Sequence, residues 1–314
     1  MGRARRRPSP GRAELIRAAA QIERFSMPFK YDDLITRKMD DRAFSYTDTQ
    51  VMLYALGVGM GRDPFDKREL PYVFELPKLR AVPTVVTVLG AGGGGGPGLF
   101  DGIDIDWHRM LHGEQRITLH RPLPPSADAI VSARIADVID KGADKGALIF
   151  LRSDARLASG EPLYSSEATM FCRGDGGCGG PSKSTPPVHP LPERAPDLTH
   201  VTETRVDQAL LYRLNGDRNP LHADPAFAAR GGFPAPILHG LCSYGIACRA
   251  VLASVCDYDD TRMKAFDVRF TSPVFPGETI ATDIWVDGEV VSFRSRVEAR
   301  GITSLNNGRC VITG

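Results

Sequence analysis

The sequence lacks an excess of charge of either sign. Its 314 residues include 39 lysines and arginines and 38 aspartates and glutamates, which gives a net charge of +1. Nucleic acids and anionic membrane surfaces are bound by concentrated positive charge, which this balance does not provide. Long hydrophobic runs are also missing, because no stretch approaches the roughly 18 to 20 apolar residues of a membrane-spanning helix. We therefore expect no nucleic-acid partner and no membrane partner, and a small molecule as the ligand.

Cysteine motifs and a dinucleotide fingerprint are absent as well. The six cysteines are too sparse for a disulfide scaffold, and no C-x-x-C pair offers a zinc site. We expect reduced, structural cysteines, which fits a cytoplasmic location. The glycine run at 92–96 does not follow the G-x-G-x-x-G pattern that opens a helix after a strand, so NAD binding is not expected. We predict no metal and no cofactor.

Two shifts in composition divide the chain. Residues 1–26 hold seven arginines and two acids, and we expect an extra, disordered segment there. It is either a transit peptide or, as we favour, the product of an upstream start codon before Met27. Residues 173–198 are rich in glycine and proline, which is typical of a linker. The segments 27–172 and 199–314 then form two domains of ordinary size.

The second half predicts a helix that is surrounded by protein. Residues 239–255 carry a single charge, at Arg249, and small or apolar residues on every face. Shorter helices are expected at 208–214 and after Asp224, an N-cap residue followed by proline. Period-two alternation predicts antiparallel strands, and a buried helix followed by such strands suggests a sheet wrapped around it. These strands lie at 263–270, 278–286, 290–299 and 310–313, and in the first half at 115–121, 129–138, 147–156 and 163–171.

The two halves also echo each other. Residues 54–64, YALGVGMGRDP, resemble 212–220, YRLNGDRNP, and the tripeptide LHG at 111–113 recurs at 238–240. A proline-punctuated strand entry follows LHG in each half. Duplication of one ancestral domain is the simplest explanation.

The stretch GDRNPLH places an acid and an imidazole close together. On a straight α-helix, Asp217 and His222 would point roughly 140° apart. Pro220 argues against such a helix, while Gly216 and Asn219 favour a turn. A turn can bring both side chains to one water, which one group deprotonates while the other donates or orients. The expected chemistry is the addition or removal of water, although an isolated acid and histidine are more simply a helix cap and a structural residue.

The surrounding sequence resembles a known family. The string YRLNGDRNPLHADP is similar to the signature of the hydratase 2 family, the MaoC-like (R)-specific enoyl-CoA hydratases. YALGVG, FEL followed by VPT, LHGEQ, DVIDKG, PILHGLC and RFTSPVFPG resemble, in order, stretches of the hydratase 2 part of peroxisomal multifunctional enzyme type 2. The resemblance runs from about residue 27 to 313. It implies an α+β double hot-dog fold, two antiparallel sheets each wrapped round a central helix. Only the second half then carries a catalytic loop, and the first accommodates the acyl chain.

The resemblance also implies roles for individual residues. Asp217 and His222 match the catalytic pair, and Asn219 helps to position water or substrate. Gly240 matches the glycine of the later LHG and begins the buried helix, where unpaired N–H groups and the helix dipole favour a developing oxyanion. Glu75 matches a glutamate near the active site. The expected CoA contacts are His112, Gly113, Lys141 and Phe270; Lys141 is equally explained as a solvated turn residue and Phe270 as ordinary core.

The leading hypothesis is the reversible hydration of trans-2-enoyl-CoA to (R)-3-hydroxyacyl-CoA, with the acyl-CoA as substrate. One alternative keeps the site and changes the substrate to a branched or dicarboxylic acyl-CoA that is dehydrated. Another is a non-catalytic subunit that binds acyl-CoA, and a thioesterase follows from analogy of fold alone. The hot-dog resemblance is compatible with a homodimer.

Overall fold

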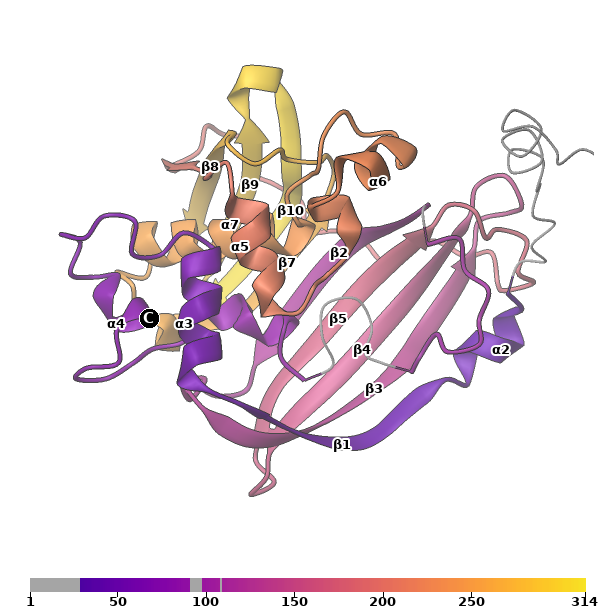
Figure 1. Ribbon diagram of the computed structural model, residues 1–314, viewed down its shortest axis with the longest axis horizontal. Helices are drawn as coiled ribbons and strands as arrows, with labels where there is room; N and C mark the ends of the chain where they lie inside the picture. The colour runs from indigo at the N-terminus through magenta and orange to yellow at the C-terminus, as the bar shows by residue number, and fades with distance from the viewer. Residues whose placement is uncertain (1–28, 91–97, 108) are drawn as a thin grey trace, which may run out of the picture.

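One antiparallel sheet of ten strands organises the protein (Figure 1). The computed structural model describes residues 29–90, 98–107 and 109–314, so the predicted N-terminal segment 1–26 lies outside the described residues. The strands of the first half are β1 (Lys38–Tyr46), β2 (Met110–Leu119), β3 (Ala127–Asp140), β4 (Ala147–Leu157) and β5 (Pro162–Cys172). Those of the second half are β6 (Leu198–Glu203), β7 (Met263–Phe270), β8 (Thr279–Asp287), β9 (Val290–Val297) and β10 (Ile302–Ile312).

The two halves of the sheet have the same strand order. In the order β1-β3-β4-β5-β2-β7-β10-β9-β8-β6, each half reads 1-3-4-5-2 when its strands are counted from its own first strand. The halves join where β2 pairs with β7, with Gln115 opposite Val268 and Ile117 opposite Phe266. The expected double hot-dog fold is confirmed, and its two sheets are continuous with each other. The repeated topology is what a duplication predicts.

The sequence echo between the halves is only partly structural. Tyr54 and Tyr212, which begin the two matching stretches, lie on helices that pack together, with ring centroids 5.9 Å apart. The two LHG tripeptides, however, are not equivalent. Residues 111–113 lie in strand β2, whereas residues 238–240 lead into a helix.

The helices lie mainly beside the second half of the sheet (Figure 1). In the first half they are α2 (Tyr31–Ile35), α3 (Asp48–Gly57), α4 (Leu70–Val73) and the 3₁₀-helix η1 (Pro83–Thr87). In the second half they are α5 (Gln208–Tyr212), α6 (Pro225–Arg230) and α7 (Gly240–Ser254), with 3₁₀-helices η2 (Arg213–Asn215), η3 (Pro220–His222), η4 (Asp260–Arg262) and η5 (Glu298–Arg300). The predicted helices at 208–214, after Asp224 and at 239–255 are confirmed within a few residues.

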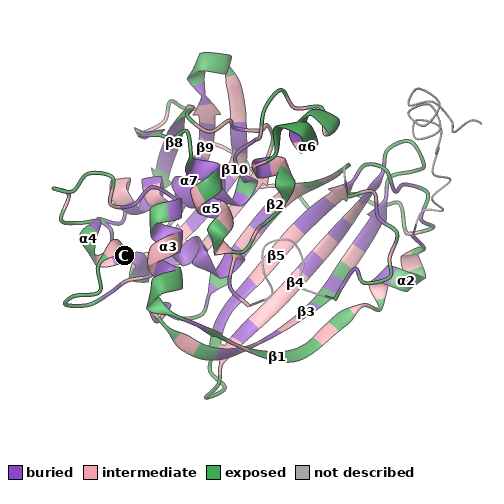
Figure 2. Ribbon diagram, viewed as in Figure 1, coloured by how far each residue is buried: buried purple, intermediate pink, exposed green. Residues whose placement is uncertain are grey.

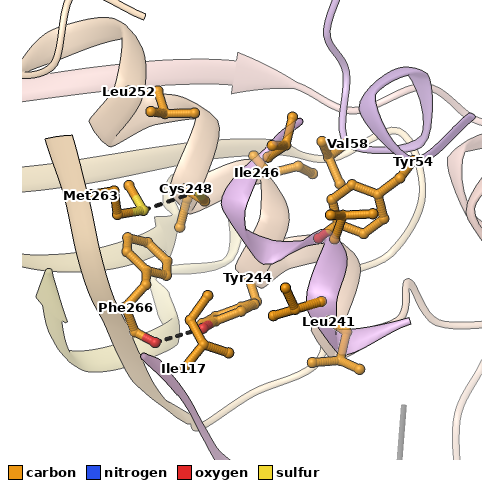
Figure 3. Close-up of a cluster of buried hydrophobic side chains, with 14 of the residues drawn as sticks. Tyr54, Val58, Ile117, Leu241, Tyr244, Ile246, Cys248, Leu252, Met263 and Phe266 are labelled. Atoms are coloured by element: carbon orange, nitrogen blue, oxygen red, sulfur yellow. Dashed lines mark hydrogen bonds between the residues drawn. The ribbon is translucent and has the colours of Figure 1, made fainter. Parts of the chain in front are cut away.

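Helix α7 is the buried helix of the second half. It contacts β6, β7, β8 and β10 on one side and η1 on another, and its purple ribbon in Figure 2 marks its burial. Eleven of its 15 residues are buried, as its uniformly small and apolar composition predicts. In the core cluster of Figure 3, Leu241 and Tyr244 of α7 lie near Ile117 of β2. The helix therefore belongs to a core that both halves share.

Helix α3 of the first half packs against the second half and forms hydrogen bonds with it. A Cβ on Gly245 of α7 would overlap Val58 at the end of α3, so only glycine permits this close approach. The carbonyl oxygen of Gly57 accepts hydrogen bonds from Gln208 Nε2, at 2.5 Å, and from Cys242 Sγ, at 3.4 Å. The last turn of α3 therefore contacts α5, which precedes the GDRNPLH loop, and α7, which follows it.

Several predicted boundaries are wrong. Strands β1 and β6 were not predicted, and the stretch 310–313 is only the end of β10, which begins at Ile302. Both missed strands form edges of the sheet with a single partner each, and most of their residues are exposed, so they lack clear alternation. Strand β6 begins at Leu198, the last residue of the predicted linker.

The rest of the linker has neither helix nor strand, but it is anchored to the sheet. The carboxylate of Asp140, at the end of β3, accepts hydrogen bonds from the backbone N–H groups of Gly142, Gly177 and Gly179. Further along, the carbonyl of Arg194 accepts a hydrogen bond from Trp285 Nε1, at 2.8 Å. The connection between the halves is therefore fixed at several points along its length.

Two further expectations from the sequence concern membrane-spanning helices and the state of the cysteines. No helix within the described ranges has the length and apolar character needed to cross a bilayer. All six cysteines are buried and unpaired, as expected of structural thiols.

Candidate active site

The GDRNPLH stretch forms the turn that the sequence predicts. Gly216 ends η2 with a φ of 120°, a backbone conformation that favours glycine. The Oδ1 atom of Asp217 then accepts a hydrogen bond from the backbone N–H of Asn219, at 3.1 Å. Asn219 Oδ1 in turn accepts from the N–H of Leu221, at 3.0 Å, and caps η3. These two local bonds shape a loop that returns His222 toward Asp217.

His222 is held in one tautomer. Its side chain is buried, and Nδ1 lies 2.8 Å from the carbonyl oxygen of Ile237. Because a carbonyl oxygen can only accept, Nδ1 carries the proton and Nε2 of the neutral ring is free to accept one. Burial lowers the pKa of His222, while the bond to Ile237 and the charge of Asp217 oppose this shift. The arrangement provides a neutral base with its lone pair on Nε2.

A second histidine, His239, completes the group and was not assigned a role from the sequence. Its ring stacks on that of His222, with centroids 3.6 Å apart and planes inclined by 24°. Its Nε2 donates to the main-chain carbonyl of Asp217, at 3.3 Å. Burial above all lowers the pKa of His239 to about 3, and the proximity of His222 and Arg213 adds to this shift. The one available signal was its place directly before Gly240 in the second LHG.

Asp217, His222 and His239 converge on one point. An atom that could bind a ligand on each lies within 4.8 Å of those on the other two. The same three residue types can bind a metal ion, and they can equally hydrogen bond a water molecule or a substrate atom.

The helix start lies beside this group. Gly240 is the exposed first residue of α7, and it follows His239 directly. Its N–H has no acceptor within the helix, so it is available to a bound group. A Cβ on Gly240 would lie 3.2 Å from two ring carbons of Phe270, and the Phe270 ring in turn contacts that of His112, with centroids 4.9 Å apart. The structure thus brings Gly240, Phe270 and His112 together next to the histidine pair.

Two of the predicted CoA contacts, His112 and Gly113, lie near the start of strand β2. His112 is partly buried, its Nε2 donates to the Glu114 carbonyl at 3.1 Å, and burial lowers its pKa to about 4. Gly113 sits at an irregularity in the β2–β5 register, where a Cβ would lie 3.2 Å from the carbonyl oxygen of Thr169. Close backbone packing therefore explains this glycine without reference to a ligand.

Lys141 and Glu75 are both exposed. Lys141 follows β3, and the strand pairing at this end of the sheet places it three strands from the start of β2, roughly 14 Å away. Glu75 follows α4, and Val73 in that helix lies against Gly61, where an added Cβ would be 3.1 Å away. The role that the family resemblance implies for Glu75 stays a prediction.

Comparison with known proteins agrees with this fold. Two family models match in succession, the MFE-2 hydratase 2 N-terminal domain over residues 44–174 and the MaoC-like domain over residues 187–307. The chain is 41% identical over 293 residues to enoyl-CoA hydratase ChsH3 of Mycobacterium tuberculosis, covering 92% of this chain and 98% of that protein. It is 38% identical over 296 residues to the peroxisomal enoyl-CoA hydratase 2 of Arabidopsis thaliana, covering 88% and 94%. A MaoC-like dehydratase from Phytophthora capsici has a similar structure, with a TM-score of 0.79 and 32% identity over 90% of this chain and 97% of that one.

The fold and the matches to named enoyl-CoA hydratases place the protein among the lyases of the MaoC-like, double hot-dog class. Within that class, the chain belongs to the enoyl-CoA hydratase 2 family.

Proposed function

We propose that the protein hydrates trans-2-enoyl-CoA reversibly to (R)-3-hydroxyacyl-CoA. The observation that carries this proposal is the convergence of Asp217 and His222 beside the first N–H of α7. An acid, a base and a fixed hydrogen-bond donor around one point are what the addition of water to a conjugated thioester requires. The chain's identity to named enoyl-CoA hydratases supports the choice of substrate.

In the proposed mechanism the three groups act on different atoms. His222 Nε2 takes a proton from the water whose oxygen attacks C3. In hydration Asp217 donates a proton to C2. The proton that His222 took from water then passes to Asp217 and restores the acid, so one water is consumed in each turnover. The Gly240 N–H donates to the thioester oxygen as it gains negative charge, a contact worth roughly 3 kcal/mol in a transition state. Asn219 shapes the loop through its side-chain bond to Leu221.

The remaining candidate residues are proposed to contact different parts of the CoA moiety. Phe270 and His112 form an aromatic surface next to Gly240, where the pantetheine arm leaves the thioester. Lys141 lies further along the same edge of the sheet, at a distance that the extended CoA molecule spans, and its cation suits a phosphate. The mechanism needs no metal and no redox cofactor, since every step is a proton transfer or a hydrogen bond.

A panel of trans-2-enoyl-CoAs of increasing chain length tests the activity. We expect the ultraviolet absorbance of the conjugated thioester to fall on addition of enzyme, and chiral analysis to give the (R)-3-hydroxy product. Formation of the (S) product would contradict the proposed stereochemistry. Binding of acyl-CoA without turnover would favour a non-catalytic subunit, release of free thiol would favour a thioesterase, and turnover of branched or dicarboxylic substrates alone would favour a specialised dehydratase.

The pH dependence of kcat/KM tests the role of His222. The base must be neutral, and burial lowers its pKa below the ordinary value near 6.5. Activity should therefore persist as the pH falls through about 6.5, and decline only when the pH passes the lowered pKa of His222. Measurement of kcat/KM between about pH 4.5 and 8 checks this. An acidic limb with its midpoint above about 6.5 would rule out His222, in its buried state, as the base.

Location and assembly stay predictions. We keep the cytoplasmic location proposed from the reduced cysteines, although the Arabidopsis relative is named as peroxisomal. A homodimer also stays a prediction, which light scattering on the purified protein tests.

A further inference from the structure

His239 touches every part of the proposed catalytic machinery. It is the N-cap of α7, and its carbonyl oxygen accepts from the N–H groups of Cys242 and Ser243, which fixes the first turn of the helix. Its Nε2 holds the main chain of Asp217, and its ring covers that of His222. The loop and the helix start are separate segments of the chain, and His239 connects them in addition to the bond from His222 to the Ile237 carbonyl.

The other surroundings of His239 hold its ring in place. Tyr212 packs on it with ring centroids 5.0 Å apart and planes inclined by 52°. The charged groups that act on the His222–His239 pair are Asp217 and Arg213. Since the pKa of His239 is lowered to about 3, its ring is neutral near pH 7 and carries its single proton on the Nε2 that donates to Asp217.

Packing alone does not explain a histidine at this position. The Nδ1 atom of His239 is buried and has no hydrogen-bond partner among the described residues. An unpaired buried acceptor destabilises a folded protein, and an apolar ring of similar size would avoid this cost. A residue that is unfavourable for stability yet central to a site is typical of a functional constraint.

We propose that His239 is a positioning residue that holds the acid–base pair and the oxyanion donor in one fixed arrangement. Its N–H fixes the Asp217 segment, its ring plane fixes the plane of His222, and its main chain places the Gly240 N–H. The kinetic consequences of this role rest on the proposed hydratase function, whereas the orientation of His222 does not.

His239→Phe is the decisive variant. Phenylalanine keeps a planar ring against His222 and Tyr212, but it removes the donor to Asp217 and the unpaired Nδ1. We expect an unfolding temperature equal to or above that of the wild type, with kcat for crotonyl-CoA hydration lowered about tenfold and KM changed little, because small misplacements of reacting groups slow chemistry. His239→Gln, which can restore a donor to the Asp217 carbonyl, should recover part of kcat. A fall in stability that parallels the fall in kcat, or wild-type kcat in His239→Phe, would overturn the proposal.

Nitrogen-15 NMR of the histidine side chains gives a readout that needs no substrate. In the wild type we expect His222 to show the tautomer protonated at Nδ1, and in His239→Ala, which removes the ring that covers His222, a mixture of tautomers. A single unchanged tautomer of His222 in His239→Ala would overturn the positioning role even if the wild type hydrates no enoyl-CoA, so the two proposals fail separately. His189→Gln is the matched control. His189 is a partly buried histidine that hydrogen bonds Ser292 on β9, and its replacement should leave both kcat and the His222 signals unchanged.

Discussion

Replacing His222 with asparagine should lower kcat for enoyl-CoA hydration by at least about a hundredfold, as expected for a general base. Asparagine Nδ2 occupies a place close to that of imidazole Nδ1, so the variant can keep the hydrogen bond to the Ile237 carbonyl and the fold. It has no counterpart of Nε2, the atom that accepts the water proton. Asp217→Asn should give a loss of similar size, because Oδ1 can still accept from the Asn219 N–H while the acid is gone. Initial rates with crotonyl-CoA measure both effects.

The double variant Asp217→Asn/His222→Asn should be little worse than either single variant, because groups that act in one step lose their effect together. Asp224→Asn is a matched control from the same segment. The Asp224 carboxylate caps α6 through the N–H groups of Ala226 and Phe227, and asparagine is an N-cap of similar strength, so Asp224→Asn should leave both stability and turnover close to the wild type. Turnover near the wild-type rate in both single variants, with intact circular dichroism spectra, would reject the acid–base assignment.

The sequence predicted the interior of this fold better than its edges. Helix α7 and strands such as β7 are recognisable because burial on all sides, or on one face, leaves a clear periodicity. Strands β1 and β6 pair on one side only and are mostly exposed, so their side chains are under little constraint. The continuity of the two sheets through β2 and β7 depends on contacts far apart in sequence, which no local pattern records.

The candidate site was predictable where a short stretch determines its own shape. Gly216 and Asn219 fix the turn locally, so the approach of Asp217 and His222 follows from the sequence. The contacts of His239 do not follow from the sequence, because they depend on a helix start that tertiary packing brings against the loop. The role of Glu75, which the family resemblance places near the site, stays a prediction, since this exposed residue follows α4, far from the GDRNPLH loop in sequence.

The first half contributes to the site although it supplies no catalytic loop. The Gly57 carbonyl of α3 is held by Gln208 in α5, just before the loop, and by Cys242 in the first turn of α7. The same half supplies His112, whose ring packs on Phe270. Both flanks of the loop therefore contact the first half, whose residues also belong to the core that the two halves share.

Gly240→Ala keeps the helix-start N–H, but its Cβ is adjacent to that donor and would lie 3.2 Å from the Phe270 ring. We expect the Cβ to hinder the approach of the thioester oxygen and to reduce kcat/KM by on the order of tenfold to a hundredfold, since such a donor is worth roughly 3 kcal/mol in comparable sites. Alanine is a better helix former than glycine, so the unfolding temperature should not fall for reasons of helix propensity. Steady-state kinetics with crotonyl-CoA, alongside thermal unfolding, separate the two effects.

A double-mutant cycle with Phe270→Leu shows which consequence of the Cβ matters. If the alanine acts by crowding the ring, the smaller leucine should relieve it, and the effects of the two changes should be strongly non-additive. If it acts by keeping the thioester oxygen from the Gly240 N–H, the loss should remain in the double variant, and this is the result we expect. Wild-type kcat/KM in Gly240→Ala would remove the oxyanion role from this residue and leave the Asp217–His222 pair to act without it.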